Sequence, residues 1–257
     1  MSFNTSQHEA IRHKDGPMLV LAGPGSGKTL VITERTRCLI EEYHIAPSNI
    51  LVITFTKAAA MEMKERFSRL TSGKGYPVTF GTFHAVFFSM LKHAYHYTAE
   101  NIVREEQRVQ CMREIIAKHR LEYEDEMEFV QTLLGEIGLV KNAGIKVANY
   151  YSKNCAEEMF RRIYSEYHEY LYNHRLIDFE DMLLYTWELL SERADILRAW
   201  QQKYRYILID EFQDINKLQF DIVKLLAGEA QNLFVVGDDD QSIYRFRGAK
   251  PEIMLRF

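Results

Sequence analysis

Residues 17–29, PMLVLAGPGSGKT, are the part of the chain that indicates its fold most clearly. The apolar run 17–22 has the length and composition of a buried strand, and the glycine-rich stretch 23–27 follows it directly. Apolar residues then recur at helical spacing between residues 32 and 43. A strand, a glycine-rich loop and a helix in this order form the context in which phosphate-binding loops are found.

The loop itself matches the phosphate-binding pattern G-x-x-x-x-G-K-[ST], with alanine in place of the first glycine. Glycines let the backbone curl so that successive N–H groups point at phosphate oxygens. The lysine adds a positive charge at the β- and γ-phosphates, and the threonine hydroxyl is a ligand for Mg²⁺. We therefore expect a nucleoside triphosphate and Mg²⁺ to be bound by Ala22, Gly23, Pro24, Gly25, Ser26, Gly27, Lys28 and Thr29.

Three more runs rich in β-branched residues also end in polar or charged residues. Residues 49–55 (NILVITF) lead into a helical segment, 206–209 (YILI) end at Asp210-Glu211, and 232–237 (NLFVVG) end at three aspartates. Buried parallel strands with functional residues at their carboxyl ends are typical of an open α/β sheet. At that edge we expect Asp210 to hold Mg²⁺ through water and Glu211 to orient and deprotonate an attacking water.

Between residues 93 and 176 the sequence becomes charged and helix-favouring, with no convincing strand. We expect this segment to be an all-helical subdomain inserted into a discontinuous α/β domain that comprises 1–92 and 177–257.

Composition restricts the class of protein. The chain has 257 residues, 47% of them hydrophobic, and a net charge of −4, which argues against coating of nucleic acid by bulk attraction. The three cysteines lie far apart, so neither a disulfide framework nor a zinc site is expected. No apolar run approaches the roughly 20 residues that span a bilayer, and the start is too polar for a secretory signal. We expect a cytoplasmic protein without a membrane partner.

Taken together, the motifs resemble those of superfamily I DNA helicases of the UvrD/PcrA/Rep type, which implies a RecA-like P-loop core. Phe3-Asn4 with Gln7 is similar to the family's Q motif, in which the glutamine reads the adenine edge, so the resemblance implies ATP as the nucleotide. Residues 178–182 (DFEDM) resemble the stretch that marks the return to the core. Residues 210–214 (DEFQD) are very close to the family's acidic motif and differ from the D-E-A-D of superfamily II.

Two segments are similar to the motifs that line the single-stranded DNA track, 54–56 (TFT) and 81–84 (GTFH). Their aromatic rings could stack on bases, and their hydroxyls could hold phosphates. The usual T-F-T-N-K-A-A reads T-F-T-K-A-A-A here, so no contact is assigned to Lys57. The DNA contacts implied by the resemblance are Thr54, Phe55, Thr56, Thr82, Phe83 and His84.

Residues 237–249 (GDDDQSIYRFRGA) are similar to the family's motif III. The resemblance implies that Gln241 contacts the γ-phosphate and that Tyr244, Phe246 and Arg247 reach DNA. Phe246 stands where many members have tryptophan, which preserves a ring for stacking.

Members of the family continue into a second RecA-like domain, which holds an adenine-stacking tyrosine and the arginines that stabilise the transferred γ-phosphate. We therefore expect the polypeptide to continue beyond Phe257, and we expect the chain alone to bind Mg·ATP weakly and to hydrolyse it slowly or not at all. For Arg35, on the helix after the loop, the sequence leaves a place in the nucleotide pocket and a solvent-exposed position both open.

The resemblance implies ATP-driven translocation along single-stranded DNA and separation of strands at a single-strand/duplex junction. Two alternatives stay open, namely the motor portion of a helicase-nuclease and a nucleotide-gated DNA-binding module without helicase activity. A P-loop metabolic kinase has less support, because nothing between residues 55 and 250 resembles a small-molecule lid. The sequence decides neither translocation polarity nor a role in repair, replication restart or recombination.

Overall fold

The structure is a computed structural model in which residues 3–238 are described. The chain forms two compact units, one comprising Met1–Val86 with Trp187–Phe257 and the other Phe87–Thr186. Both breaks lie inside helices, α4 (Phe83–Tyr95) and α8 (Phe179–Glu192), where the sequence pattern does not change. The division into domains at residues 92 and 176 stays a prediction.

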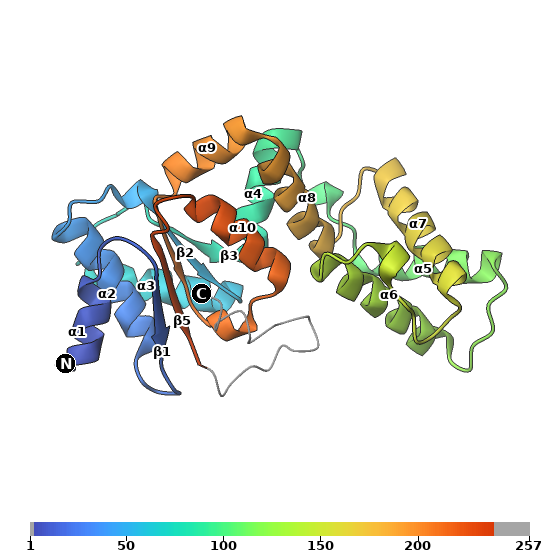
Figure 1. The fold of residues 1–257 in the computed structure, drawn as a ribbon, viewed down its shortest axis with the longest axis horizontal. Coiled ribbons are helices and arrows are strands. Elements are labelled where there is room, and N and C mark those ends of the chain that lie inside the picture. Colours follow the sequence, from blue (N-terminus) through green and yellow to red (C-terminus); the bar gives the residue numbers. More distant parts are fainter. Residues whose placement is uncertain (1–2, 239–257) are drawn as a thin grey trace. The chain divides into compact units, whose positions relative to one another are not determined.

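The α/β unit contains a sheet of five parallel strands in the order β1-β5-β4-β2-β3 (Figure 1). Strands β2, β4 and β5 are buried at every residue, which explains their nearly continuous apolar sequences. This all-parallel sheet confirms the predicted α/β class. The strands are β1 (Met18–Leu21), β2 (Ile50–Thr54), β3 (Thr79–Thr82), β4 (Tyr206–Ile209) and β5 (Leu233–Gly237).

Three helices pack on one face of this sheet and share a buried core with it. They are α1 (Thr5–Arg12), α2 (Lys28–Glu41) and α3 (Lys57–Leu70), whose residues Ile11, Leu39 and Phe67 share a buried cluster with Val52 and Val236. The unit is completed by η1 (Pro47–Asn49), α9 (Ala194–Lys203), η4 (Phe212–Asp214) and α10 (Lys217–Ala227).

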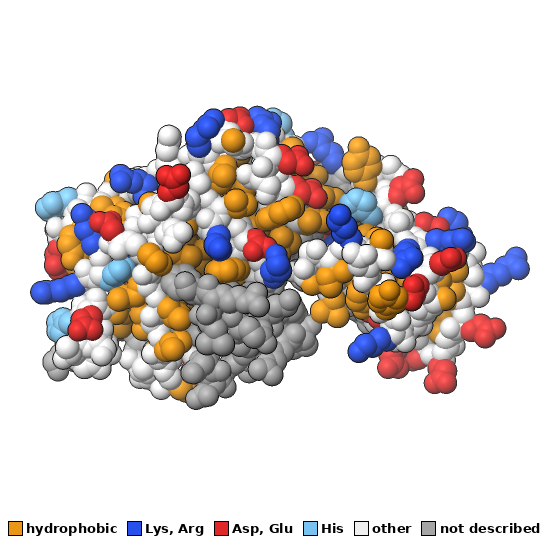
Figure 2. Space-filling model, viewed as in Figure 1, with side chains coloured by type: hydrophobic (Ala, Val, Ile, Leu, Met, Phe, Trp, Pro, Cys, Tyr) orange, Lys and Arg blue, Asp and Glu red, His pale blue; other side chains and the backbone are white. Residues whose placement is uncertain are grey.

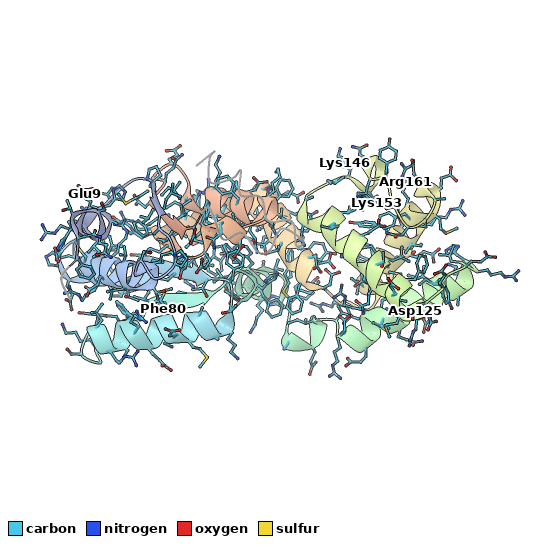
Figure 3. The ribbon with its side chains drawn as sticks, turned by 90° about the horizontal axis from the view of Figure 1, so that it is seen from below. Glu9, Phe80, Asp125, Lys146, Lys153 and Arg161 are labelled. Atoms are coloured by element: carbon cyan, nitrogen blue, oxygen red, sulfur yellow. The ribbon has the colours of Figure 1, made fainter. Side chains whose placement is uncertain are left out.

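The helical unit has its own core between α5 (Glu105–Lys118), α6 (Glu126–Asn142) and α7 (Glu157–Asn173), with η2 (Ala99–Asn101) and η3 (Val147–Asn149) in its connections. No strand occurs between residues 93 and 176, all of which the structure describes. Asp125, labelled in Figure 3, caps α6 by accepting a hydrogen bond from the Glu128 N–H at 2.8 Å. The acidic stretch at this point therefore has a local role, because negative charge is favourable at a helix N-terminus.

A buried ion cluster lies inside the helical unit. The Lys141 Nζ is 2.7 Å from both Asp178 Oδ2 and Asp181 Oδ1, and the exposed fraction of each of these side chains is 2% or less. Tyr167 donates to Asp178 Oδ2 at 3.3 Å, and Arg108 donates in turn to the Tyr167 hydroxyl. Burial, and after it the charge of Asp178, raises the pKa of Asp181 to about 7.

The surface carries mixed charge, and the cysteines are unpaired. Side chains of both charge signs lie among hydrophobic ones on the face shown in Figure 2. Cys38, Cys111 and Cys155 are all free thiols, as predicted. Among the described residues, no helix is both long and apolar enough to cross a membrane.

Candidate nucleotide-binding site

The glycine-rich loop joins β1 to α2 at the carboxyl edge of the sheet. Gly25 and Gly27 have φ angles of 71° and 84°, which glycine adopts without strain, and α2 begins directly afterwards at Lys28. The Ala22 N–H donates to the Gly237 carbonyl at 3.0 Å, which ties the start of the loop to the end of β5. The loop thus presents a helix N-terminus, where backbone N–H groups favour an anion.

Lys28 points across this edge toward two carboxylates. Its Nζ lies 3.5 Å from Glu211 Oε2 and 3.8 Å from Asp238 Oδ2, and its side chain is only 11% exposed. The strand order explains why these three side chains lie together, because β1, β5 and β4 are neighbours and their carboxyl ends lie side by side. Lys28 and Glu211, which are 183 positions apart in sequence, are therefore parts of one site.

Asp210 and Glu211 follow β4 as predicted, but their environments differ. Asp210 is 5% exposed, and its backbone N–H donates to the Ile53 carbonyl of β2 at 3.0 Å. Burial, and after it the charge of Glu211, raises the pKa of Asp210 to about 6. The Glu211 side chain is 41% exposed and its backbone is left-handed, with φ 54°. A buried carboxylate beside a more open one suits the predicted roles of Mg²⁺ ligand and water-orienting base.

Gln213 is a site residue to which the sequence analysis assigned no role. Its side-chain Nε2 donates to Glu211 Oε2 at 2.7 Å, and its Oε1 accepts from the Asp238 N–H at 3.0 Å. The signal was present in the DEFQD motif, since an amide side chain two residues after a strand-end carboxylate is placed to bind it. Its second partner, Asp238, directly follows β5 and could not be predicted from local sequence.

Gln7, the residue of the Q-motif resemblance, contacts the glycine-rich loop. It is in the first turn of α1, its Oε1 accepts from the Asn4 N–H, and its Nε2 donates to the Ser26 carbonyl at 3.0 Å. Gln7 therefore holds the loop in its present course. Recognition of adenine by Gln7 stays a prediction.

Arg35 is in neither of the two positions that the sequence left open. Its side chain is 1% exposed, and its guanidinium donates to the carbonyls of Ala10 and Lys14 at 3.4 and 3.2 Å. The guanidinium carbon also lies 4.4 Å from the centre of the Phe234 ring. Arg35 satisfies carbonyls at the end of α1 from within the core, so it is not carried forward as a nucleotide ligand.

The DNA-track candidates lie at the same edge of the sheet, on neighbouring strands. Thr54 pairs with Thr82 in the register of β2 with β3, so 54–56 and 82–84 are brought together. Phe55 is partly exposed and meets Phe83 edge-on with ring centres 5.3 Å apart. Thr56 and Thr82 use their hydroxyls to accept from the N–H groups of residues 59 and 85.

Burial excludes direct DNA contact for two of these residues, Thr54 and Phe83. Thr54 is 1% exposed and donates its hydroxyl to the Thr56 carbonyl, and Phe83 is 1% exposed. A side chain enclosed on all sides cannot lie against a base or a phosphate, so neither residue is carried forward as a DNA contact. Thr56 is exposed, while Phe55, Thr82 and His84 are partly exposed. Gln241, Tyr244, Phe246 and Arg247 lie outside the described residues.

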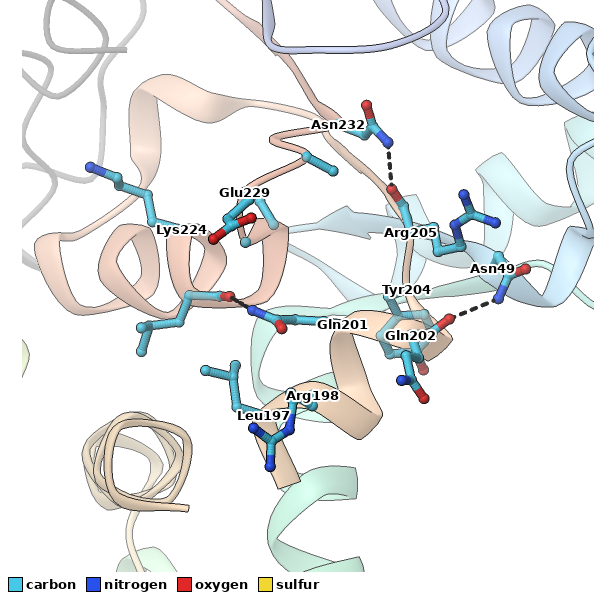
Figure 4. Close-up of a pocket in the computed structure, with 14 residues that line it drawn as sticks. Asn49, Leu197, Arg198, Gln201, Gln202, Tyr204, Arg205, Lys224, Glu229 and Asn232 are labelled. Carbon is cyan, nitrogen blue, oxygen red and sulfur yellow. Dashed lines mark hydrogen bonds between the residues drawn. The ribbon is translucent and has the colours of Figure 1, made fainter. Parts of the chain in front are cut away.

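A cavity of about 920 Å³ lies at the opposite, amino-terminal edge of the sheet (Figure 4). Asn49, Arg205 and Asn232, which line it, come just before β2, β4 and β5. Asn49 and Gln201 donate to backbone carbonyls around it, which satisfies the ends of α9 and α10. The cavity is therefore separate from the phosphate-binding loop and plays no part in the nucleotide site.

Comparison with known proteins agrees with this geometry. The family model of the UvrD/REP helicase N-terminal domain matches residues 3–257. The chain is 40% identical over its full length to a putative ATP-dependent DNA helicase, YjcD, of Bacillus subtilis, of which it covers 34%. It is 35% and 36% identical to the ATP-dependent DNA helicases PcrA of Staphylococcus aureus and Bacillus subtilis, with 99% of the chain and 35% of each relative covered.

The chain spans about a third of the length of these curated relatives. The resemblance stated from the motifs is confirmed, because the match extends from the Q motif to the end of the chain. The chain belongs to the UvrD/REP helicase N-terminal domain family.

Proposed function

We propose that this chain is the ATP-binding first motor domain, with its inserted helical subdomain, of an ATP-dependent single-stranded DNA translocase and helicase. The observation that carries the proposal is the meeting of Lys28 with Glu211 beside the buried Asp210 at the carboxyl edge of the sheet. The relatives named as ATP-dependent DNA helicases support it. In the proposal the domains are 1–92 with 177–257 and 93–176, and the protein works in the cytoplasm.

The residues of the site fit ATP and Mg²⁺. A Cβ built on Gly23 or Gly25 would have no atom of the described residues within 4 Å, so the space beside the loop backbone is open to phosphates. Lys28 would exchange its long contacts with carboxylates for phosphate oxygens, and Thr29 and Asp210 would hold the metal. When bound, Mg²⁺ would neutralise charge on the β- and γ-phosphates. Glu211 would then orient the attacking water and accept its proton.

On the same edge, Phe55 with Thr56, Thr82 and His84 would form part of the single-stranded DNA track. An exposed ring at a strand end suits stacking on any base, and a hydroxyl or imidazole suits phosphate contact. The net charge of −4 fits a track made by a few local contacts rather than by a basic surface.

We further propose that a second motor domain, carried elsewhere in the natural polypeptide, completes the site. An arginine that reaches the γ-phosphate can contribute about 10³–10⁵-fold to turnover. The chain by itself would therefore bind Mg·ATP weakly and turn it over slowly. In the complete protein, closure of the two domains on ATP would move single-stranded DNA toward a duplex junction.

The test is steady-state ATP hydrolysis with and without single-stranded DNA, beside a nucleotide-binding titration. The chain and the complete polypeptide are compared, each with Lys28→Ala and with Lys64→Ala as a matched control on the exposed face of α3. We expect nucleotide binding that needs Lys28, and DNA-stimulated turnover only in the complete polypeptide. Brisk DNA-stimulated turnover by the chain alone would refute the need for a second domain, and binding that tolerates Lys28→Ala would refute the site.

A further inference from the structure

Gln213 connects three separate segments of the candidate site. Its amide donates to Glu211 Oε2 on the β4 side and accepts from the Asp238 N–H at the end of β5. Lys28, at the start of α2, contacts the side chains of the same two residues, Glu211 and Asp238. Gln213 and Lys28 therefore both contact Glu211 and Asp238, and Gln213 does so through both the nitrogen and the oxygen of its amide.

The position of the Glu211 carboxylate depends on such a contact. Its side chain is 41% exposed, so solvent alone would leave it several rotamers. Its backbone also adopts φ 54°, a conformation disfavoured for a residue with a Cβ and held only where the surroundings determine it. The 2.7 Å bond from Gln213 is the shortest side-chain contact recorded for this carboxylate.

The chemical nature of the partner matters as well. A neutral amide N–H can orient a carboxylate without adding a full charge beside it, whereas a lysine or arginine would pull down its basicity more strongly. A carboxylate in place of the amide would repel Glu211. Glutamine is therefore suited to hold a general base in place while leaving it able to accept a proton.

We propose that Gln213 is a positioning residue, which aims the Glu211 carboxylate and links it to the end of β5. The inference rests on the proposed function, since it concerns the water-activating step of ATP hydrolysis.

Two substitutions separate the two bonds, and both are made in the complete polypeptide. Gln213→Glu keeps an acceptor for the Asp238 N–H but turns an oxygen toward Glu211, while Gln213→Ala removes both contacts. Gln219→Ala is the matched control, because Gln219 is also buried, at 5%, and its side-chain oxygen only caps the start of α10. Measurements are kcat and KM for ATP with and without single-stranded DNA, nucleotide affinity, and hydrogen exchange of the Asp238 amide.

We expect both Gln213 variants to lose about 10–100-fold in kcat, the range typical of groups that orient a functional ligand, with KM and nucleotide affinity within about threefold of the parent. Gln219→Ala should keep the parental kcat and nucleotide affinity. The Asp238 amide should exchange faster in Gln213→Ala and stay protected in Gln213→Glu.

A Gln213→Glu variant with parental kcat overturns the proposal, as does an unchanged Asp238 amide in Gln213→Ala. Losses of the same size in Gln219→Ala would also overturn it, since they would reduce the effect to general destabilisation. Failure of the proposed function is distinguishable, because the parent itself would then show no Lys28-dependent ATP turnover while the exchange experiment would still report on the bond.

Discussion

Replacement of Lys141 by methionine tests whether the buried ion cluster holds the helical unit together. The lysine is 0% exposed and lies 2.7 Å from each of two carboxylates, so its loss leaves Asp178 and Asp181 enclosed without a cation. Breaking a buried pair by removing one partner costs about 3–5 kcal/mol, because the remaining charge stays desolvated. At 1.36 kcal/mol per tenfold change, this corresponds to about two to four powers of ten in the unfolding equilibrium.

The assay is native-state hydrogen exchange of the slowest amides in α6 and α7, with amides of β4 as an internal reference. Lys118→Met is the matched control, since Lys118 is in the same unit but 65% exposed and contacts one carboxylate, Glu166. Exposed pairs contribute about 0–1 kcal/mol, so the control should change exchange by less than tenfold. Adding Asp178→Asn and Asp181→Asn to Lys141→Met should recover much of the loss, because neutral side chains remain.

Two outcomes would refute this reasoning. If Lys141→Met destabilised α6 and α7 no more than Lys118→Met, the cluster would not stabilise the unit. If the triple variant were as unstable as Lys141→Met alone, the loss would come from altered packing rather than from an uncompensated charge.

Three further changes have defined outcomes. Asp181→Asn should flatten the pH dependence of the melting temperature. The folded-state pKa of Asp181, about 7, is above the ordinary value, so its contribution to stability is present below pH 4 and is lost as pH rises to 7. Parallel curves of melting temperature against pH for parent and variant would contradict this prediction. Phe55→Ala should weaken single-stranded DNA binding by about 1–3 kcal/mol in fluorescence anisotropy, and parental affinity would remove Phe55 from the track. Gly228→Ala should lower the stability measured in thermal melts by about 1–3 kcal/mol, because the φ of Gly228 is 57° and an added Cβ would lie 2.9 Å from Gln201 Nε2. Gly75→Ala is the control and should be neutral, because an added Cβ there would lie in open space.

The parts of the fold that were predictable from sequence are those encoded by local pattern. The apolar runs predicted four of the five strands, since a buried parallel strand needs a continuous apolar segment, whereas β3 (TFGT) is too polar to stand out. The acidic pair after β4 was predictable for the same reason. The strand order was not, because pairing depends on contacts such as those between Ile53 and Ile209 that no local pattern records.

Side-chain direction at strand ends was the main source of error in the site. Thr54 and Phe55 are adjacent, yet one is enclosed and the other partly open, because Thr54 ends a strand that is buried at every residue whereas Phe55 lies just beyond it. The buried position of Arg35 was not predicted because a charged residue is rarely fully buried, and its partners are the carbonyls of Ala10 in α1 and of Lys14 just after it, which sequence does not identify.

The backbone links at the carboxyl edge also bear on how the motor would work. The Asp210 N–H is bonded to the Ile53 carbonyl, so Asp210, the proposed metal ligand, is joined to β2, the strand that Phe55 follows. Ladder hydrogen bonds between buried strands resist relative sliding, and the nucleotide and DNA candidates of this unit should therefore move together. A single rigid sheet cannot shorten a track along DNA. Stepping then requires movement of this unit against a second body, which is the physical reason for proposing that another motor domain completes the machine.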